Sequence, residues 1–357
     1  MEDMTARRPR TRWTRTGVLL AGIAALLLFA ACSETGPLDT LKPEGPVAQK
    51  QYDLLVPVMW IAAFVFVLVE GLILFISYRF RHRKGVDAIP KQVHGNKRLE
   101  IGWTLVPTVL LAAIAVPTVG TIFELAKEPD PATRVDVRII AHQWWWEVEY
   151  LDEELFTANE IHIPTGRPIY FTLEARNANA EIPVIHSFWI PKLGGKQDVV
   201  PGRINYLTLQ ADHPGTYPGQ CAEYCGLSHA YMRMAVIAES PEDYEAWLDE
   251  QRATASLAPD NPLAQRGFEL FQDFGGGQSC MQCHAINGLG SPSRIGPDLT
   301  HLASRDTFGA FLFDMNAEEL ARWLENPAAM KAGSRMPDYG LTPDEIDALV
   351  AFLLTLE

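Results

Sequence analysis

The chain concentrates its metal-binding chemistry in one stretch, Cys221-Ala222-Glu223-Tyr224-Cys225-Gly226-Leu227-Ser228-His229-Ala230-Tyr231-Met232. A further histidine, His186, lies upstream in the run Ile185-His186-Ser187-Phe188-Trp189. Two thiolates, two imidazoles and one thioether form a soft ligand set, and soft ligands select copper. A blue-copper site needs only one cysteine, so a second one lets two thiolates bridge two copper ions. We therefore predict a binuclear copper site whose ligands are His186, Cys221, Cys225, His229, Met232 and one backbone carbonyl.

Two other interpretations of these residues remain open. A disulfide between Cys221 and Cys225 is feasible outside the cytoplasm, and a set of two cysteines and two histidines could bind zinc. Neither interpretation accounts for Met232 or for the distant His186. The sequence therefore favours copper over both.

The residues around this loop form short β-rich runs that are interrupted by turns. Short strands at such spacing are typical of a β-sandwich or barrel of about a hundred residues. We predict such a domain over residues 133–250, with strands at 135–141, 144–150, 161–163, 169–173 and 206–209.

Two apolar runs precede the β domain, at residues 54–78 and 102–125. Each is long enough to cross a bilayer as a helix. The connector between them, residues 79–98, contains seven basic residues against the single acid Asp87. The positive-inside rule places such a loop in the cytoplasm. We predict a transmembrane helical hairpin over residues 50–126, with both mature termini and the C-terminal domains on the outer face.

The N-terminus has the pattern of a targeting segment. Several arginines precede an apolar run at residues 17–31, which is short for a span and typical of a signal-peptide core. Ala30-Ala31-Cys32 resembles the lipobox of bacterial lipoproteins, in which the cysteine is acylated. We predict a signal peptide over residues 1–31, with Cys32 as a lipidation candidate; the alternative is an ordinary thiol.

Composition and charge exclude several classes of protein. Among 357 residues the net charge is −14, and this acidic excess argues against a nucleic-acid-binding protein. A hydrophobic content of 48% excludes a disordered chain, and five cysteines are too few for a disulfide scaffold of this length. Residues 1–123 hold 14 basic and 9 acidic residues, whereas residues 124–357 hold 16 and 35. The sequence indicates a membrane-attached protein with an acidic outer body.

A second outer domain follows a polar linker at residues 251–262. Cys280-Met281-Gln282-Cys283-His284 is a haem-attachment motif, in which both thiols bond the haem and the histidine binds its iron. The motif alone could be chance or a zinc site. Its surroundings argue for haem: Ile295-Gly296-Pro297-Asp298-Leu299 resembles the loop whose proline carbonyl orients the haem histidine. Thr342-Pro343-Asp344-Glu345 is a capping box before an amphipathic helix. Residues 263–357 resemble an all-α class I cytochrome c.

The sixth ligand of the haem iron has three candidates downstream of the attachment motif, Met315, Met330 and Met336. A methionine ligand raises the haem potential and suits an electron carrier. Met336 lies in a loop just before the final helix, as in class I cytochromes. We predict Met336 as the ligand and packing roles for the other two.

The copper loop also carries a family resemblance. Cys-x-Glu-x-Cys-x3-His-x2-Met after an upstream histidine resembles the CuA loop of cytochrome c oxidase subunit II. The resemblance extends to Ala141-His142-Gln143-Trp144-Trp145-Trp146, to Val200-Pro201-Gly202-Arg203 and to the hairpin, roughly residues 50 to 250. It implies a cupredoxin-like barrel for the β domain and the CuA type of binuclear copper centre.

The resemblance implies roles for four further residues. Glu223 would offer its carbonyl to copper and its carboxylate to a magnesium ion shared with subunit I. Trp144 would be a surface aromatic where electrons enter, and Arg203 would face haem propionates of subunit I. Glu100 would lie at the mouth of a proton channel. Core packing for Trp144 and a helix-start role for Glu100 are the alternatives.

Two features qualify these expectations. Pro183 stands where the family commonly has an acid, which weakens any transfer of its docking surface for a soluble cytochrome. Glu70 lies inside the first span, where a charged group is costly, and we expect it to face a neighbouring subunit.

Together these patterns predict a multidomain protein of the bacterial inner membrane, with a transmembrane α-hairpin, a cupredoxin-like domain and a class I cytochrome c domain. The resemblance implies the electron-accepting subunit of a caa-type oxidase. Its expected partners are subunit I, other oxidase subunits, and a cytochrome c or cytochrome bc complex as donor. Oxygen reduction to water and proton translocation would occur in subunit I. The alternatives are a copper-containing subunit of nitric oxide reductase and a membrane copper-binding or assembly protein.

Overall fold

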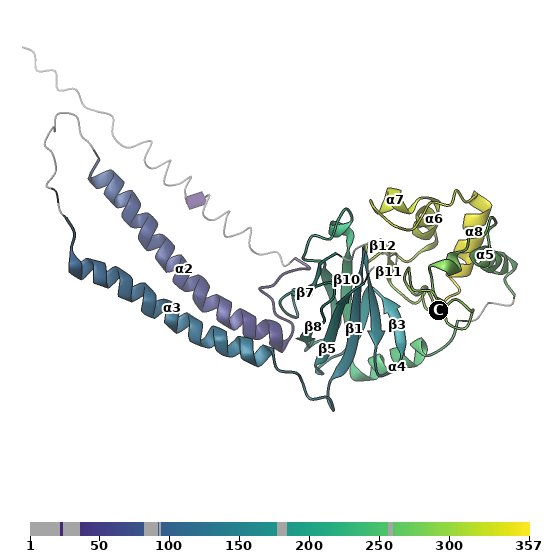
Figure 1. The fold of residues 1–357 in the computed structure, drawn as a ribbon, viewed down its shortest axis with the longest axis horizontal. Helices are drawn as coiled ribbons and strands as arrows, with labels where there is room; N and C mark the ends of the chain where they lie inside the picture. Colours follow the sequence, from purple (N-terminus) through teal and green to yellow (C-terminus); the bar gives the residue numbers. More distant parts are fainter. Residues whose placement is uncertain (1–21, 24–35, 82–91, 93, 177–183, 256–259) are drawn as a thin grey trace, which may run out of the picture.

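The computed structural model describes residues 22–23, 36–81, 92, 94–176, 184–255 and 260–357. A helical hairpin leads into a sheet-rich domain, which is followed by a helical domain (Figure 1). This order is the one that the sequence predicts. The lipidation candidate Cys32, Pro183 and all but two residues of the predicted signal peptide lie outside the described residues.

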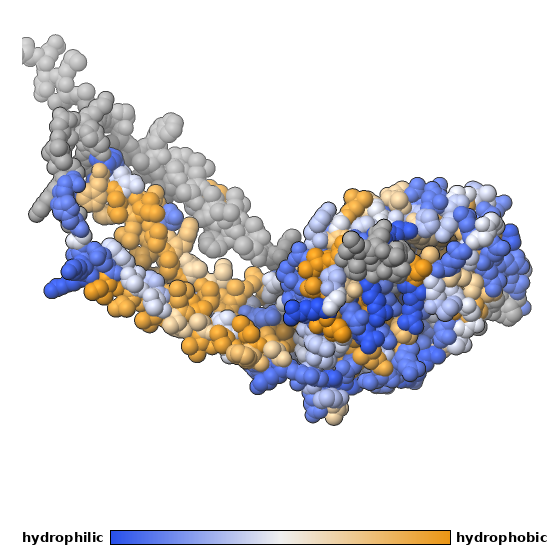
Figure 2. Space-filling model, viewed as in Figure 1, coloured by the Kyte–Doolittle hydropathy of each residue, from blue (hydrophilic) through white to orange (hydrophobic). Residues whose placement is uncertain are grey.

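The hairpin consists of α2 (Pro46–Arg79) and α3 (Lys97–Leu125), and both are apolar and long enough to cross a membrane. Figure 2 shows their apolar side chains along the outside of both helices. Pro107 and Pro117 lie inside α3 without ending it. The start of α3 is capped by the Asn96 side chain, which accepts from the backbone N–H groups of Arg98 and Leu99.

The end of the hairpin that contains the start of α2 and the end of α3 packs against the sheet-rich domain. Ala48 of α2 is buried, and Val47 packs against the core of that domain. Lys50 pairs with Glu124 of α3 at 2.5 Å. At Gly45 a Cβ atom would lie 1.9 Å from the carbonyl oxygen of Gln210, so only glycine permits this approach.

The sheet-rich domain contains two main sheets. One has the strand order β3-β2-β1-β5-β8, and the other has the order β4-β10-β9. The β1–β5 and β4–β10 pairs are parallel, and the other pairs within these sheets are antiparallel. The strands of the first sheet are β1 (Val135–His142), β2 (Trp145–Tyr150), β3 (Leu155–Ala158), β5 (Ile169–Ala175) and β8 (Asn205–Leu209). The other strands are β4 (Glu160–Pro164), β9 (Gly215–Gln220), β10 (Arg233–Glu239) and the pair β6 (His186–Phe188) and β7 (Gln197–Val199).

The core of this domain lies between the sheets. Every second residue of β1 and β5 is buried there, including Val137, Ile139, Phe171 and Leu173, as the period of a strand requires. α4 (Pro241–Gln251) adds Tyr244 and Leu248 to the same core. This packed core fixes the positions of the strand ends. The copper loop connects two of these strands, β9 and β10.

The helical domain is built around the contact of α5 (Pro262–Gln272) with α8 (Pro343–Leu353). A Cβ atom at Gly267 would lie 1.9 Å from the carbonyl oxygen of Ala348, so glycine allows the two helices to approach closely. The predicted capping box at the start of α8 is formed by Thr342 and Glu345. The remaining elements of this domain are η2 (Cys280–Gln282), β11 (Thr307–Phe308), β12 (Phe313–Asp314), α6 (Ala317–Glu325) and α7 (Pro327–Met330).

Candidate copper and haem centres

The copper loop connects β9 to β10, which pair antiparallel. The backbone N–H of Cys221 donates to the carbonyl of Met232 at 2.9 Å, so the pairing of the strands continues to the first and last residues of the loop. Within the loop, η1 (His229–Tyr231) turns the chain back toward β10. Residues that are far apart along the loop are therefore brought to one place.

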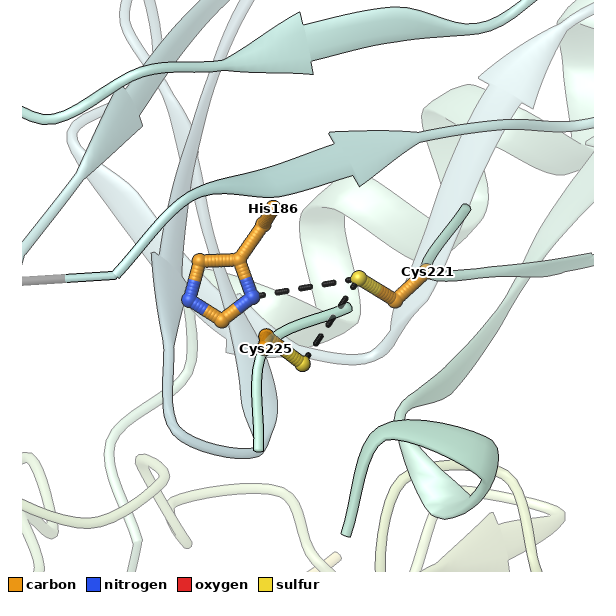
Figure 3. Close-up of side chains that lie close together, drawn as sticks. All are labelled: His186, Cys221 and Cys225. Atoms are coloured by element: carbon orange, nitrogen blue, oxygen red, sulfur yellow. Dashed lines mark hydrogen bonds between the residues drawn. The ribbon is translucent and has the colours of Figure 1, made fainter. Parts of the chain in front are cut away.

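His186 reaches the same place from another part of the domain. It is the first residue of β6, and Ala222 of the loop donates its N–H to the carbonyl of the adjacent Ser187 at 2.9 Å. His186 Nδ1 lies 3.8 Å from Cys221 Sγ, and Figure 3 shows both side chains directed at the same point as Cys225. The distant histidine thus joins the loop as the sequence predicts.

The other soft donors surround Cys225. Its Sγ lies 3.8 Å from Cys221 Sγ, 3.6 Å from His229 Nδ1 and 3.8 Å from Met232 Sδ. The Cys221 thiol also lies 3.2 Å from the carbonyl oxygen of Glu223. All predicted copper-site residues therefore occupy one compact cluster.

The geometry of the two thiols excludes a disulfide in this structure, because a disulfide joins sulfurs at about 2.05 Å. Both thiols, His186 and Met232 are almost fully buried. The hydrogen bond from the Cys225 thiol holds the pKa of Cys221 far below its ordinary value, despite burial. A buried set of thiol, imidazole and thioether donors fits a soft metal, and in particular copper.

A second site lies in a cavity of about 420 Å³ between the sheet-rich and helical domains. The attachment-motif residues Cys280, Cys283 and His284 line it together with Met336. Trp144 and other residues of the sheet-rich domain form part of its wall. The lining includes both thiols, the histidine and the methionine that a covalent haem requires.

His284 is held in the orientation expected of a haem ligand. Its Nδ1 lies 2.8 Å from the carbonyl oxygen of Pro297, which leaves Nε2 for a metal. Burial lowers the pKa of this imidazole and so favours its neutral, metal-binding form. A Cβ atom at Gly296 would lie 2.6 Å from the imidazole, so glycine is needed beside the ring.

The three candidate methionines lie in different places. Met336 lines the cavity, and its sulfur accepts from the indole N–H of Trp323 at 3.1 Å. Met330 lines a separate groove beside α6, and Met315 packs at the edge of the helical core. Of these three described residues, the structure thus brings only Met336 to the attachment motif.

Trp144 connects the two sites. Its side chain lines the haem cavity, and its indole N–H donates to the carbonyl of Cys225 at 3.0 Å. The amide of Gln143 donates to the same carbonyl at 2.7 Å. Trp144 is partly buried between the domains; the family resemblance implied a surface aromatic, and core packing was the alternative.

The comparisons with known proteins match every part of this architecture. Residues 42–120 match the transmembrane domain of cytochrome c oxidase subunit II, and residues 153–239 match its periplasmic domain. Residues 264–357 match cytochrome c. "Cytochrome c oxidase subunit 2" of Alkalihalophilus pseudofirmus is 37% identical over 336 residues, covering 93% of this chain and 94% of that protein. The chain belongs to the cytochrome c oxidase subunit II family.

Two other relatives refine the comparison. "Cytochrome c oxidase subunit 2" of Bacillus sp. (strain PS3) is 37% identical and covers 95% of this chain. "Quinol oxidase subunit 2" of Bacillus cereus is 35% identical, and its match covers 66% of this chain. The chain is thus a subunit II with a C-terminal cytochrome c domain, and the predicted fold class is confirmed.

Membership of the family has direct consequences. A subunit II implies an oxidoreductase complex with subunit I and other oxidase subunits. Its periplasmic domain implies CuA copper, and the cytochrome c domain implies haem. The two apolar helices fit a membrane protein with two spans.

Four predicted roles concern groups other than the ligands of the two centres. The Glu223 carboxylate lies 3.9 Å from Lys196 Nζ, and Arg203 and Glu70 are exposed. Glu100 accepts from the N–H of Asn96 at 3.2 Å, which is the helix-start role that the sequence left open. Their expected contacts with magnesium, haem propionates and a proton channel stay predictions.

Some residues between the domains of this subunit II were not found by sequence reasoning. Lys331 donates to the carbonyl of Trp144, and the carboxylate of Glu160 accepts from the N–H of Thr307 at 3.0 Å. The sequence offered one indication of the Lys331 contact, because Lys331 is the only lysine among residues 263–357. Nothing in the sequence singles out Glu160 or Thr307.

Proposed function

We propose that this subunit II delivers electrons to subunit I of a respiratory cytochrome c oxidase, which reduces oxygen to water and translocates protons. Electrons would come from a cytochrome c or a cytochrome bc complex and pass through the covalent haem c and then the CuA centre. The observation that carries this proposal is the position of Trp144, which lines the haem cavity and donates to the carbonyl of Cys225. One side chain thereby links the two centres.

The ligands follow from the two clusters. For copper we propose His186, Cys221, Cys225, His229, Met232 and the carbonyl of Glu223. For haem we propose thioether bonds from Cys280 and Cys283, with His284 and Met336 as the axial iron ligands. When bound, each group accepts and releases single electrons.

The protein groups around these ligands keep them in fixed positions. Pro297 orients His284, and Gln143 and Trp144 both donate to the Cys225 carbonyl. The copper ligands Cys221, Cys225, His186 and Met232 are almost fully buried, so water is kept away from them. Buried, preorganised ligands change little in position when charge changes, and this suits electron transfer.

Other roles in the proposal rest on the family resemblance. Glu223 would share a magnesium ion with subunit I, Arg203 would face its haem propionates, and Glu100 would open a proton path. The bulk of the chain would lie on the periplasmic face, because the basic connector after α2 belongs in the cytoplasm. The proposed domains are the hairpin at 50–126, the CuA domain at 133–250, the linker at 251–262 and the cytochrome domain at 263–357.

The test is an optical and near-infrared spectrum of the full chain, produced with copper and haem-attachment machinery. We expect a low-spin c-type haem together with the near-infrared band of a mixed-valence copper pair. Haem without that band would mean that the copper cluster binds one copper ion, zinc or no metal. The proposed electron path would then be wrong.

A further inference from the structure

The contact between the two outer domains is rich in positive charge. Residues 263–357 contain thirteen acidic and only six basic residues. Arg294, Lys331 and Arg335 all make polar contacts with the sheet-rich domain. Within these described residues, half of the basic side chains thus lie on the one face that meets the copper domain.

Lys331 occupies the central position on this face. It follows α7 directly, it is 5% exposed, and it lines the haem cavity. Its ammonium donates to the carbonyl of Trp144 at 2.7 Å and to the carbonyl of Gly309 at 3.1 Å. One acceptor belongs to each domain, so the side chain joins them across the wall of the cavity.

The chain beyond Lys331 lies along the copper loop. The hydroxyl of Ser228 donates to the carbonyl of Ala332 at 2.6 Å. Gly333 faces Leu227 so closely that a Cβ atom there would lie 3.0 Å from its side chain. Arg335 donates to the side chain of Gln143. The segment 331–336, which ends at the axial ligand candidate Met336, is therefore docked on residues that flank the copper ligands.

A second set of contacts lies at the other side of the interface. Arg294 stands 3.6 Å from Glu147 and 3.3 Å above the ring of Phe156. Glu160 accepts from the N–H of Thr307 at 3.0 Å. The two sets fix the rotation as well as the position of the cytochrome domain against the copper domain.

A buried lysine at this position is costly for folding alone. An ammonium that leaves water loses hydration free energy, and backbone carbonyls replace only part of it. Burial accordingly lowers the pKa of Lys331 to about 7. An apolar residue could fill the space inside the cytochrome domain at lower cost. What the lysine adds is a bond to the backbone of Trp144 in the other domain.

We propose that Lys331 is a positioning residue, which holds the methionine loop of the cytochrome domain against Trp144 and thereby fixes the separation of haem and copper. The inference rests on the proposed function, because it requires both centres in one chain. Lys331 acts through this contact and has no part in binding either metal.

The test is the magnetic coupling between oxidised haem and oxidised CuA in the full chain, measured by pulsed electron paramagnetic resonance. A fixed contact should give the native chain one narrow distance. In Lys331→Met the ratio of docked to undocked molecules should fall by on the order of tenfold, since the hydrogen bond to the carbonyl of Trp144 is lost. The distance distribution should broaden, whereas the optical spectra of haem and copper should stay unchanged.

A kinetic measurement uses the same variants. After rapid photoreduction of the haem, one electron leaves the ferrous iron and reduces the oxidised copper pair, and no proton is needed. This step should slow by a similar factor in Lys331→Met. Lys331→Arg keeps a cationic donor and should restore much of the narrow distance and of the rate. Arg322→Gln removes an equal charge from α6, where Arg322 pairs with Glu319, and should change neither.

The outcomes separate the inference from the function on which it rests. A chain that lacks either paramagnetic signal would contradict the proposed function. Both signals with a native distance and rate in Lys331→Met would overturn the positioning role. If that variant does not fold, Lys331→Gln, whose side chain is too short to reach both carbonyls, gives the same decision.

Discussion

The copper cluster and the haem cavity are built in opposite ways. All donors of the copper cluster come from one domain, and neighbouring donor atoms already lie 3.2 to 3.8 Å apart. The haem cavity is about 420 Å³ in volume, and its lining comes from two domains. The cytochrome domain supplies Cys280, Cys283, His284 and Met336, whereas the copper domain supplies Trp144 and its neighbours.

The difference follows from the size of the group that each site fits. A metal pair needs only a few donor atoms, and one loop between paired strands can provide most of them. A haem has a large apolar surface, and residues of both domains line the cavity that fits it. The copper domain therefore serves as part of the wall, which also brings Trp144 to the haem. Under the proposed function, docking of the domains and electron transfer between the centres would therefore be coupled.

The first prediction concerns the loss of the copper centre. Cys221→Ser should abolish the binuclear centre, because a serine hydroxyl is a poor ligand for copper and cannot bridge two ions. We expect complete loss of the mixed-valence near-infrared band and of its electron paramagnetic resonance signal. The haem spectrum should persist, because the cavity residues are unchanged.

The control for this change is Ser228→Ala, which alters the same loop without removing a proposed copper ligand. It should retain the near-infrared band. A normal mixed-valence spectrum from Cys221→Ser would show that this thiol is not a copper ligand.

The second prediction addresses the haem side. Met336→Ala should leave the haem attached through Cys280 and Cys283 but open the sixth position of the iron. Added imidazole or cyanide should then bind readily, and the haem potential should fall, because a methionine ligand raises it. The copper spectrum should not change, since the copper donors lie in the other domain.

Met330→Ala is the matched control, because Met330 lies in a separate groove beside α6. Its haem should remain closed to added ligands. If Met330→Ala opens the haem and Met336→Ala does not, the axial assignment is wrong.

The contrast between the two sites also explains how much the sequence could predict. The copper loop is a short contiguous motif, so the clustering of Cys221, Cys225, His229 and Met232 was predictable from their spacing. The cytochrome motif and the cap of α8 were equally local, and the structure reproduces the cap. Such features depend on residues that are near one another in the chain, where spacing determines geometry.

The contact between the domains was not predictable, because the residues that form it lie far apart in the chain. Lys331 meets the backbone of Trp144, and Thr307 meets Glu160, across separations of more than a hundred residues. Every residue has a backbone carbonyl, so the sequence does not show which carbonyl accepts a hydrogen bond. The sequence consequently gave no sign that the cytochrome domain would cover part of Trp144.

The third prediction concerns the role of Met232 within the copper cluster. Met232→Leu keeps the apolar volume but removes the thioether, which lies 3.8 Å from Cys225 Sγ. Methionine is the weak ligand of such sites, and an axial ligand tunes the potential more than it holds the metal. We expect two copper ions per chain, as in the native protein, with a raised copper potential in a redox titration. Loss of copper would instead show that Met232 is needed for occupancy.

The smallest effect concerns the stability of the cytochrome domain alone. Thr342→Ala removes the cap of α8 and should lower the free energy of unfolding by about 1 kcal/mol. Hydrogen bonds from the Thr342 backbone and hydroxyl hold the pKa of Glu345 below its ordinary value of 4.5. Its carboxylate therefore stabilises the fold above pH 4.5, and this contribution is lost as the pH falls through the lower, folded value.

Thermal unfolding followed at the haem band and at the copper band distinguishes the domains in this experiment. In Glu345→Gln the free energy of unfolding should no longer decrease as the pH falls through the pKa of Glu345. Asp344→Asn, one position earlier in the same turn, should keep this pH dependence. If the domains unfold independently, only the haem transition should move. A parallel shift of the copper transition would mean that the shared wall makes the two domains one cooperative unit, in which the copper domain also depends on the docked cytochrome.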